Sequence, residues 1–208
     1  VFLSGFFLKS RQNGPEETVM YFFESARMLD LEKMALFVQD SSALSSLKAQ
    51  QKEWFSFFVI QAERISCEIK GATLSADTAE VTARCIFPDS SKLIQEVITD
   101  YFVETYSLSR KSIHLSPGKA DEILSGIMDN HKSLFDSPLI ERTLKIACIR
   151  EKGKWLINSV TPEMGNVLTA NFIETMSTLR QTMVEMLMLE EQGRKEKEKT
   201  EDPGTARK

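Results

Sequence analysis

The spacing of the hydrophobic residues changes near residue 64, and this change limits the folds that the chain can adopt. Before it, hydrophobic residues recur every three or four positions, which predicts amphipathic helices. The first helix begins at Pro15, which suits a first helical position, and Glu16 and Glu17 complement its N-terminus. Asp30 is placed to cap a second, short helix that extends through Val38, and residues 47–61 predict a third. Three helices therefore precede any strand.

From Arg64 onward the hydrophobic residues alternate with polar ones, which predicts strands. A first antiparallel hairpin is expected from one set of alternating residues: Ile65, Cys67 and Ile69, then Val81, Ala83, Cys85 and Phe87. A second is expected from another set: Leu144, Ile146 and Cys148, then Trp155 and Ile157 after a turn at residues 151–154. The predicted fold is α+β, with N-terminal helices packed on a curved antiparallel sheet of about four strands.

Helical spacing returns between the two hairpins and after the second one. Residues 90–108 and 117–134 predict two helices inside an insert that spans about residues 89–141. A long final helix is expected over residues 162–189, and it has one apolar stripe: Leu168, Phe172, Met176, Leu179, Met183 and Met186. We expect residues 15–189 to form a single domain and residues 190–208 to form a charged, disordered tail.

A stripe of this kind needs a partner surface, and three partners are open at this point. The stripe packs into the core, pairs with a second copy of the chain through the helix 162–189, or forms an adaptable groove for another protein. Core packing is the commonest role of such a stripe. The homodimer predicts that the stripe is exposed in an isolated subunit.

The first eight residues, Val1–Leu8, are apolar almost throughout, and Lys9 and Arg11 come after them. Eight residues cannot span a bilayer, which needs about 20. This run is either the end of a truncated signal or membrane anchor, covering residues 1–14, or a segment that packs on the domain. We favour the anchor because a polar, turn-like stretch at residues 12–14 comes after the run.

Composition and charge describe a soluble, mildly acidic body. The chain is 42% hydrophobic and 27% charged, which excludes a disordered or multi-span membrane protein. Its formal net charge is −4, and the tail is neutral, so the body carries the excess of acidic groups. A nucleic-acid binder is expected to show a basic stripe with interleaved aromatic residues, and this sequence has none.

The cysteines fit a structural role better than a chemical one. Cys67, Cys85 and Cys148 share no metal-ligand spacing, and each lies among hydrophobic neighbours in a strand-like segment. We expect three small buried residues. A disulfide between two strands remains open if the compartment is oxidising, and the sequence does not select a pair.

Several segments, taken in order, resemble one kind of domain. They are Pro15–Val19 leading into Phe22 and Phe23, Leu29–Lys33, the closing hairpin Arg150–Ile157, and Asn166–Phe172 after it. Together these residues, over roughly residues 15–172, resemble the nuclear-transport-factor-two-like (cystatin-like) domains of bacterial cell-envelope and lipoprotein-type proteins. The resemblance implies helices wrapped by a curved sheet. It also implies a location outside the cytoplasm, although Lys9 and Arg11 alone favour a cytoplasmic location for the domain.

Enzymes that have the fold this chain resembles hold an Asp or His general base inside the cone that their curved sheet forms. The two histidines here, His114 and His131, fall in the predicted helical insert, where surface histidines are expected. Asp89 is expected to cap a helix, and the cluster Asp100, Tyr101, Glu104 and Tyr106 to lie on a solvated helix face. No phosphate loop and no nucleophile elbow occur. We therefore assign no catalytic, cofactor-binding or metal-binding residue, and expect no cofactor.

The leading functional hypothesis is a non-enzymatic domain of the cell envelope, anchored at its N-terminus, that binds a protein or a small ligand. A small enzyme with its active site in the cone is the first alternative. A cytoplasmic homodimeric binding protein is the second. Membrane contact is expected only through the anchor.

Overall fold

The computed structural model describes residues 14–111 and 116–201, which form an α+β fold around an open, five-stranded sheet. The elements in chain order are α1 (Pro15–Arg27), α2 (Leu31–Ala35), β1 (Val38–Asp40), α3 (Ser42–Ala62), β2 (Ser66–Ser75), β3 (Thr78–Pro88), α4 (Ser91–Arg110), α5 (Pro117–Asn130), the 3₁₀ helix η1 (Lys132–Phe135), β4 (Leu139–Glu151), β5 (Lys154–Ser159), α6 (Pro162–Leu168) and α7 (Phe172–Glu201). The predicted α+β class, hairpins and helical insert are confirmed.

The sheet has one more strand than the sequence predicted. Its order is β1-β5-β4-β3-β2, and all neighbours are antiparallel except β1 and β5, which are parallel. The expected second helix ends at Ala35 instead of Val38, because Val38 pairs with Ile157 and Phe37 accepts a hydrogen bond from the Ile157 amide. Pairing with β5 at the edge of the sheet, between residues far apart in sequence, therefore ends the helix earlier than the local pattern predicted. Asp30 does cap this helix, since its side chain accepts a hydrogen bond from the Lys33 amide.

The closing hairpin turns through two residues with left-handed backbone conformations, Lys152 (φ 48°) and Gly153 (φ 80°). Two consecutive positive φ values match the twist of the flanking strands and suit glycine at the second position. β3 alternates strictly, with Val81, Ala83 and Cys85 buried on the inward face. The helices α1 and α6 contact the sheet, and their apolar residues share one core with that inward face.

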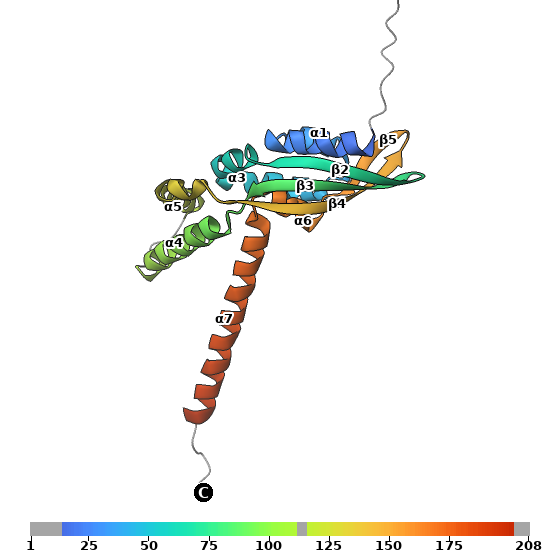
Figure 1. Cartoon of the computed structure of the whole chain (residues 1–208). Helices are drawn as coiled ribbons and strands as arrows, with labels where there is room; N and C mark the ends of the chain where they lie inside the picture. Colours follow the sequence, from blue (N-terminus) through green and yellow to red (C-terminus); the bar gives the residue numbers. More distant parts are fainter. Residues whose placement is uncertain (1–13, 112–115, 202–208) are drawn as a thin grey trace, which may run out of the picture.

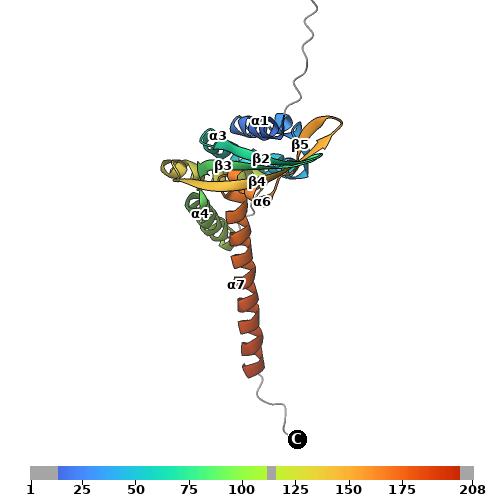
Figure 2. The same cartoon turned by 45° about the vertical axis from the view of Figure 1, so that its right-hand side comes forward.

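A second core lies beyond one end of the sheet, where the insert packs on α3 and on the start of α7. It is rich in aromatic rings: Phe172 lies 4.8 Å from Trp54 and 5.3 Å from Phe58, centroid to centroid. Leu93, Ile94 and Val97 of α4 and Met128 of α5 complete it. The arm formed by α4 and α5 and the helix α7 both project away from the sheet (Figure 1), and the turned view shows the same arrangement (Figure 2).

The predicted final helix is two helices, which corrects our expectation of one helix over residues 162–189. The chain leaves α6 at Thr169, and Ala170 (φ 51°) and Asn171 (φ 65°) take left-handed conformations before α7 begins. The second helix also continues to Glu201, into the segment we expected to be disordered. The apolar run Val1–Leu8 lies outside the described residues.

Candidate functional site

The insert and the α6–α7 link meet at a polar joint, formed by residues 89–91, 135–138 and 166–175. The Asp89 amide donates to the Pro138 carbonyl oxygen (2.8 Å), and the Ser90 amide donates to the carbonyl oxygen of Ala170 (3.2 Å). The hydroxyls of Ser90 and Ser137, both buried, are 3.1 Å apart. Both ends of the arm are therefore fixed to each other and to the start of α7.

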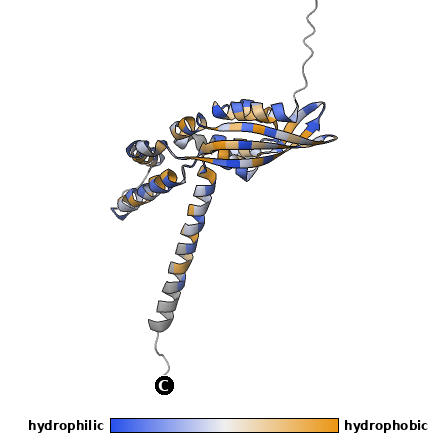
Figure 3. Ribbon diagram, viewed as in Figure 1, coloured by the Kyte–Doolittle hydropathy of each residue, from blue (hydrophilic) through white to orange (hydrophobic). Residues whose placement is uncertain are grey.

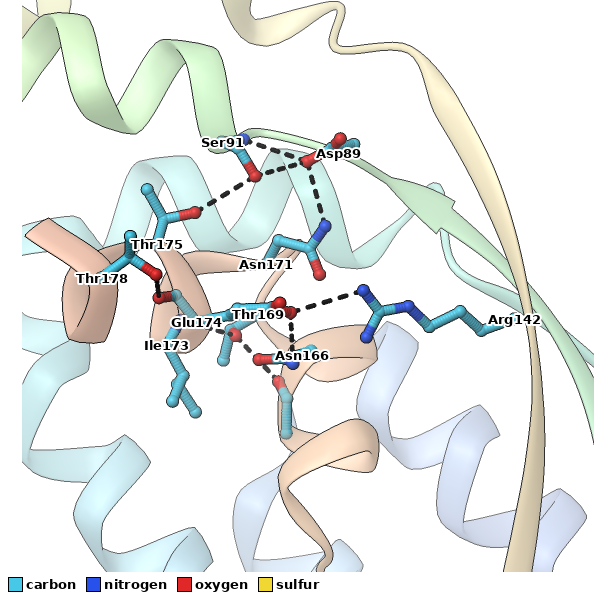
Figure 4. A network of polar contacts seen from close by, with 11 residues as sticks. Asp89, Ser91, Arg142, Asn166, Thr169, Asn171, Ile173, Glu174, Thr175 and Thr178 are labelled. Atoms are coloured by element: carbon cyan, nitrogen blue, oxygen red, sulfur yellow. Dashed lines mark hydrogen bonds and ion pairs between the residues drawn. The ribbon is translucent and has the colours of Figure 1, made fainter.

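Asp89 is the centre of the joint (Figure 4). One carboxylate oxygen accepts hydrogen bonds from the Ser91 amide (3.2 Å), the Ser91 hydroxyl (2.6 Å) and the Asn171 side-chain amide (3.0 Å). Burial raises the pKa of the Asp89 carboxyl, but these hydrogen bonds and the nearby Arg142 charge outweigh it and hold the pKa below its ordinary value. The prediction that Asp89 caps α4 was wrong by one residue, because the N-cap residue is Ser90, which makes no side-chain cap hydrogen bond. Asp89 precedes it, accepts from the first amide of the helix and links α4 to α7.

A second set of contacts joins β4 to the same link. Glu174 accepts a hydrogen bond from the Asn166 amide group at 2.8 Å and pairs with the Arg142 guanidinium at 3.4 Å. The Arg142 guanidinium also lies 6.0 Å from the centre of the Phe87 ring. Figure 4 shows Arg142 reaching from β4 toward the start of α7. The side-chain oxygen of Asn171 is buried and has no hydrogen-bond partner among the described residues.

The end of α3 holds the returning end of the arm. The Gln61 side chain donates to the Phe135 carbonyl oxygen at 2.9 Å. The Arg64 guanidinium donates to the carbonyl oxygens of Phe135 (3.0 Å) and Ser137 (2.7 Å) and pairs with Asp136 at 3.1 Å. These contacts span more than 70 residues of chain, so no local sequence signal predicted them.

The histidine that we expected at the surface has two carboxylate neighbours. His131, which caps the end of α5, lies 2.8 Å from an Asp100 oxygen and 3.6 Å from a Glu96 oxygen, both on α4. Its side chain is 19% exposed, and the two contacts tie α5 to α4. His114 lies outside the described residues.

The other members of the expected cluster on α4 do not converge. Tyr101 is partly buried against the second core, whereas Glu104 is exposed and Tyr106 is 67% exposed. Asp100 and Glu104 line one open groove of about 600 Å³ between α4 and α5, and Tyr101 and Tyr106 are not among its lining residues. The structure does not form a ligand site from Asp100, Tyr101, Glu104 and Tyr106 together.

A small apolar cavity lies among α1, α2, α3 and α6. It is lined by Ala26, Leu29, Leu31, Met34, Leu47, Phe58, Leu168 and Thr169, and its volume is about 20 Å³. This is room for about one water molecule. Thr169 is the one polar side chain of the lining, and its hydroxyl donates to the Gly165 carbonyl oxygen. The cavity thus offers no acid or base to a substrate.

Two of the three cysteines are joined, so the disulfide between two strands that the sequence left open is present. Cys67 and Cys85 lie directly opposite each other on β2 and β3, with Cα atoms 4.1 Å apart, and form a disulfide. Directly opposed residues of this antiparallel pair are close enough for such a bond. Cys148 is free and 3% exposed, and burial raises the pKa of its thiol to about 11, so it is an inert core residue.

The described ranges contain no group of three or more histidine, cysteine or acidic residues that could hold a metal ion. In those ranges, no helix is both long enough and apolar enough to cross a bilayer.

Several apolar side chains are exposed on the projecting helices. Phe102, Val103 and Tyr106 of α4 are 44%, 65% and 67% exposed. On α7, Met188 and Leu189 are 60% and 66% exposed. Figure 3 shows hydrophobic residues recurring along α7 away from the sheet. The arrangement is a rigid body with a polar joint that fixes the direction of two partly apolar helices.

Comparison with known proteins yields one weak likeness. No protein-family model matches the sequence, and no curated protein matches it. Among solved structures, the chain is similar to one described as "a putative lipoprotein (ycdA)" from Bacillus subtilis, with 19% sequence identity and a TM-score of 0.37. The match covers 77% of this chain and 47% of that one, so the chain spans about half of its length. Such a likeness carries no argument, and the resemblance to nuclear-transport-factor-two-like domains stays a prediction.

Proposed function

We propose that this chain is a non-enzymatic interaction domain of an extracytoplasmic, membrane-anchored protein of the bacterial cell envelope. Its interaction surface is the apolar face of the projecting helices, and its compact body holds them in place. The observation that carries this proposal is the combination of exposed apolar side chains on α4 and α7 with the joint around Asp89. Exposed apolar surface on a rigid support is typical of interaction sites.

The disulfide supports the proposed location outside the cytoplasm. Bonds such as Cys67–Cys85 form and persist in oxidising compartments and are rare in the reducing cytoplasm. The apolar run Val1–Leu8 supports an anchor on the N-terminal side of the domain. The two features are independent, because one depends on the redox state of the compartment and the other on the hydrophobicity of a segment outside the described residues.

The alternatives of a small enzyme or a small-ligand carrier have less support from the cavity. A drug-sized ligand needs a pocket of several hundred Å³, far larger than the cavity of about 20 Å³ beneath α1. Hollows of about 430, 600 and 710 Å³ exist among the described residues, but they are open surface grooves. General acid–base catalysis needs a titratable group within hydrogen-bond reach of the substrate, and Thr169 is the one polar side chain there.

Protease accessibility in intact cells, combined with membrane fractionation, tests the proposal. We expect the natural protein to sediment with membranes and to be cut by a protease added outside the cells, after removal of the outer membrane where one is present. A known cytoplasmic protein in the same sample must stay intact. Soluble protein that survives until the cells are lysed would refute the envelope location and favour the cytoplasmic alternative.

A further inference from the structure

An open groove lies between the two helices of the arm, and we call it the α4–α5 groove. Its volume is about 600 Å³. Its lining comes from both helices and includes Asp100, Val103 and Glu104 of α4 and Ile123, Gly126 and Ile127 of α5. The arm projects away from the sheet (Figure 1), so a large partner can approach this groove without meeting the sheet.

Apolar side chains from both helices meet in the α4–α5 groove. Ile123 and Ile127 are half-buried, and Ile127 also packs against the second core, which fixes its position. Val103, on the α4 side, is 65% exposed. A partner that covers these side chains removes apolar surface from water, which favours binding.

Gly126 leaves space on the α5 side of the groove. It lies in the interior of α5, where glycine destabilises a helix relative to alanine. Apart from its chain neighbours and the helix backbone, no atom of the described chain lies within 4 Å of its missing Cβ position. Crowding within the chain therefore does not require a glycine here. The missing side chain lets the backbone of a partner come close to α5.

The charge of the α4–α5 groove is acidic. Asp100, Glu104 and Glu122 line it, and no lysine or arginine of the described residues does so. Asp100 lies 2.8 Å from His131, and Glu122 pairs with Lys119 at 2.9 Å. Glu104 makes no hydrogen bond or ion pair with the described residues. A groove lined by charges of one sign attracts a partner of the opposite sign.

These features together favour a helix as the occupant. Small-molecule sites bury most of the ligand surface, whereas this groove is open. A groove between two packed helices accepts the apolar side of a third helix, and an unobstructed glycine allows a close approach. Anionic membranes carry the same sign of charge as the groove and are repelled by it.

We propose that the α4–α5 groove binds a basic amphipathic helix of a partner protein. The apolar side chains of that helix lie against Val103 and Ile127, and its backbone approaches α5 at Gly126. Its lysine or arginine side chains lie beside Glu104 and the two other carboxylates. This inference rests on the proposed function, because it names the chemistry of the partner for one part of the interaction surface.

Fluorescence anisotropy with the full chain tests the proposal. The probe is a labelled peptide of about 15 residues, made of leucine at helical spacing and lysine elsewhere. A matched peptide has glutamate in place of each lysine. In about 0.15 M salt, we expect the lysine peptide to bind with a dissociation constant of about 1–100 μM. The glutamate peptide should bind at least about tenfold more weakly.

Gly126→Leu fills the groove without removing any contact of the fold. Gly118→Leu is the matched control, because Gly118 also lies on α5 with open space at its Cβ position but does not line the groove. We expect Gly126→Leu to raise the dissociation constant of the lysine peptide at least about tenfold, and Gly118→Leu to change it less than about twofold. Thermal denaturation should show that neither variant melts below the unmodified chain, because leucine favours a helix more than glycine does.

Glu104→Lys tests the charge separately from the shape, and it also serves if Gly126→Leu lowers the melting temperature. Asp77→Lys is its control. Asp77 is exposed in the turn between β2 and β3, at the end of β3 that is farther from α4, and its replacement changes the net charge equally. We expect Glu104→Lys to weaken binding of the lysine peptide at least about tenfold and Asp77→Lys less than about twofold.

The inference is overturned if the lysine peptide does not bind, if the glutamate peptide binds equally well, or if the groove variants bind like their controls. It is also overturned if Gly126→Leu abolishes self-association or binding to phosphatidylglycerol vesicles instead of peptide binding. Each result leaves the protease test of location unaffected. Failure of the partner chemistry and failure of the envelope location can therefore be told apart.

Discussion

The joint around Asp89 allows the most direct stability prediction. Replacing Asp89 with alanine removes the acceptor of hydrogen bonds from the Ser91 amide, the Ser91 hydroxyl and the Asn171 side chain. Asn171 is 5% exposed, so its amide group would be left buried without an acceptor. Hydrogen bonds to a charged group contribute about 1.5–3 kcal/mol, and an unsatisfied buried donor costs about 1–3 kcal/mol. We expect Asp89→Ala to lower the free energy of unfolding by about 2–3 kcal/mol.

Urea denaturation at pH 7 measures this loss, with Asp121→Ala as the control. Asp121 is exposed on α5 and makes no hydrogen bond or ion pair with the described residues, so its replacement should change stability by less than about 0.5 kcal/mol. Amide hydrogen exchange should also show faster opening at residues 172–176 in Asp89→Ala. Equal stabilities of the two variants would refute the role of the joint.

The same comparison has a pH dependence with a defined sign. The folded state lowers the pKa of Asp89, so the carboxylate stabilises the fold fully above its unfolded pKa and loses this contribution as the pH falls through the folded pKa. The stability difference between the unmodified chain and Asp89→Ala should therefore be constant near neutral pH and shrink below about pH 5. A difference that grows on acidification would contradict this assignment.

Three further predictions concern the core, the disulfide and the turn. Phe172→Ala should lower the free energy of unfolding, measured by urea denaturation, by about 3–5 kcal/mol, because it empties the space between Trp54 and Phe58. Ile173→Ala, more exposed at the next position, should lower it by less than about 1 kcal/mol. Similar losses in the two variants would argue against the aromatic core. Cys67→Ser with Cys85→Ser should cost about 3 kcal/mol, since the bond closes a loop with a sequence separation of 18. Dithiothreitol should destabilise the unmodified chain equally and leave the double variant unchanged; an effect on both would point to another cause. Gly153→Ala should lower the stability by about 1 kcal/mol in thermal denaturation, because Gly153 has a positive φ. Lys154→Ala, the control, should lower it by less than about 0.5 kcal/mol. An unchanged melting temperature of Gly153→Ala would show that the turn tolerates a side chain.

Elements with a clear period were predictable from the sequence. Alternation at Val81, Ala83, Cys85 and Phe87 places β3, and Pro15 marks the start of α1. In both cases the prediction depends only on residues close in sequence, because burial on one face of a strand or helix needs a regular spacing of hydrophobic residues. The hairpin at Lys152 and Gly153 was predictable for the same reason, as its turn chemistry is local.

Elements that depend on distant partners were not predictable. The strand β1 exists because Val38 pairs with Ile157, and nothing in the residues around Val38 distinguishes it from a helix end. The break between α6 and α7 has no glycine or proline; it accompanies contacts of Ala170 with Ser90 and of Asn171 with Asp89.

The contacts of the candidate site also fall into local ones, which the sequence predicts, and long-range ones, which it does not. The bond of Asp89 with the Ser91 amide joins neighbours in sequence, so a cap was predicted there, one residue before the actual N-cap Ser90. The bond of Asp89 to Asn171 crosses 82 residues and could not be inferred. The contact of His131 with Asp100 crosses 31 residues, and the spacing of single residues contains no signal for it. The pairing of Cys67 with Cys85 was left open, although both lie on the hairpin that the alternation predicts.

The number of free thiols in the natural protein tests the extracytoplasmic location most directly. Cells are opened into acid to prevent thiol exchange, and the denatured protein is alkylated and weighed by mass spectrometry. The structure has one free thiol, Cys148, because Cys67 and Cys85 are joined. If the domain resides in an oxidising compartment, the peptides that contain Cys67, Cys85 and Cys148 together gain one alkyl group before reduction and three after it. Three alkyl groups without reduction would show that the bond does not form in the cell and would contradict the proposed location.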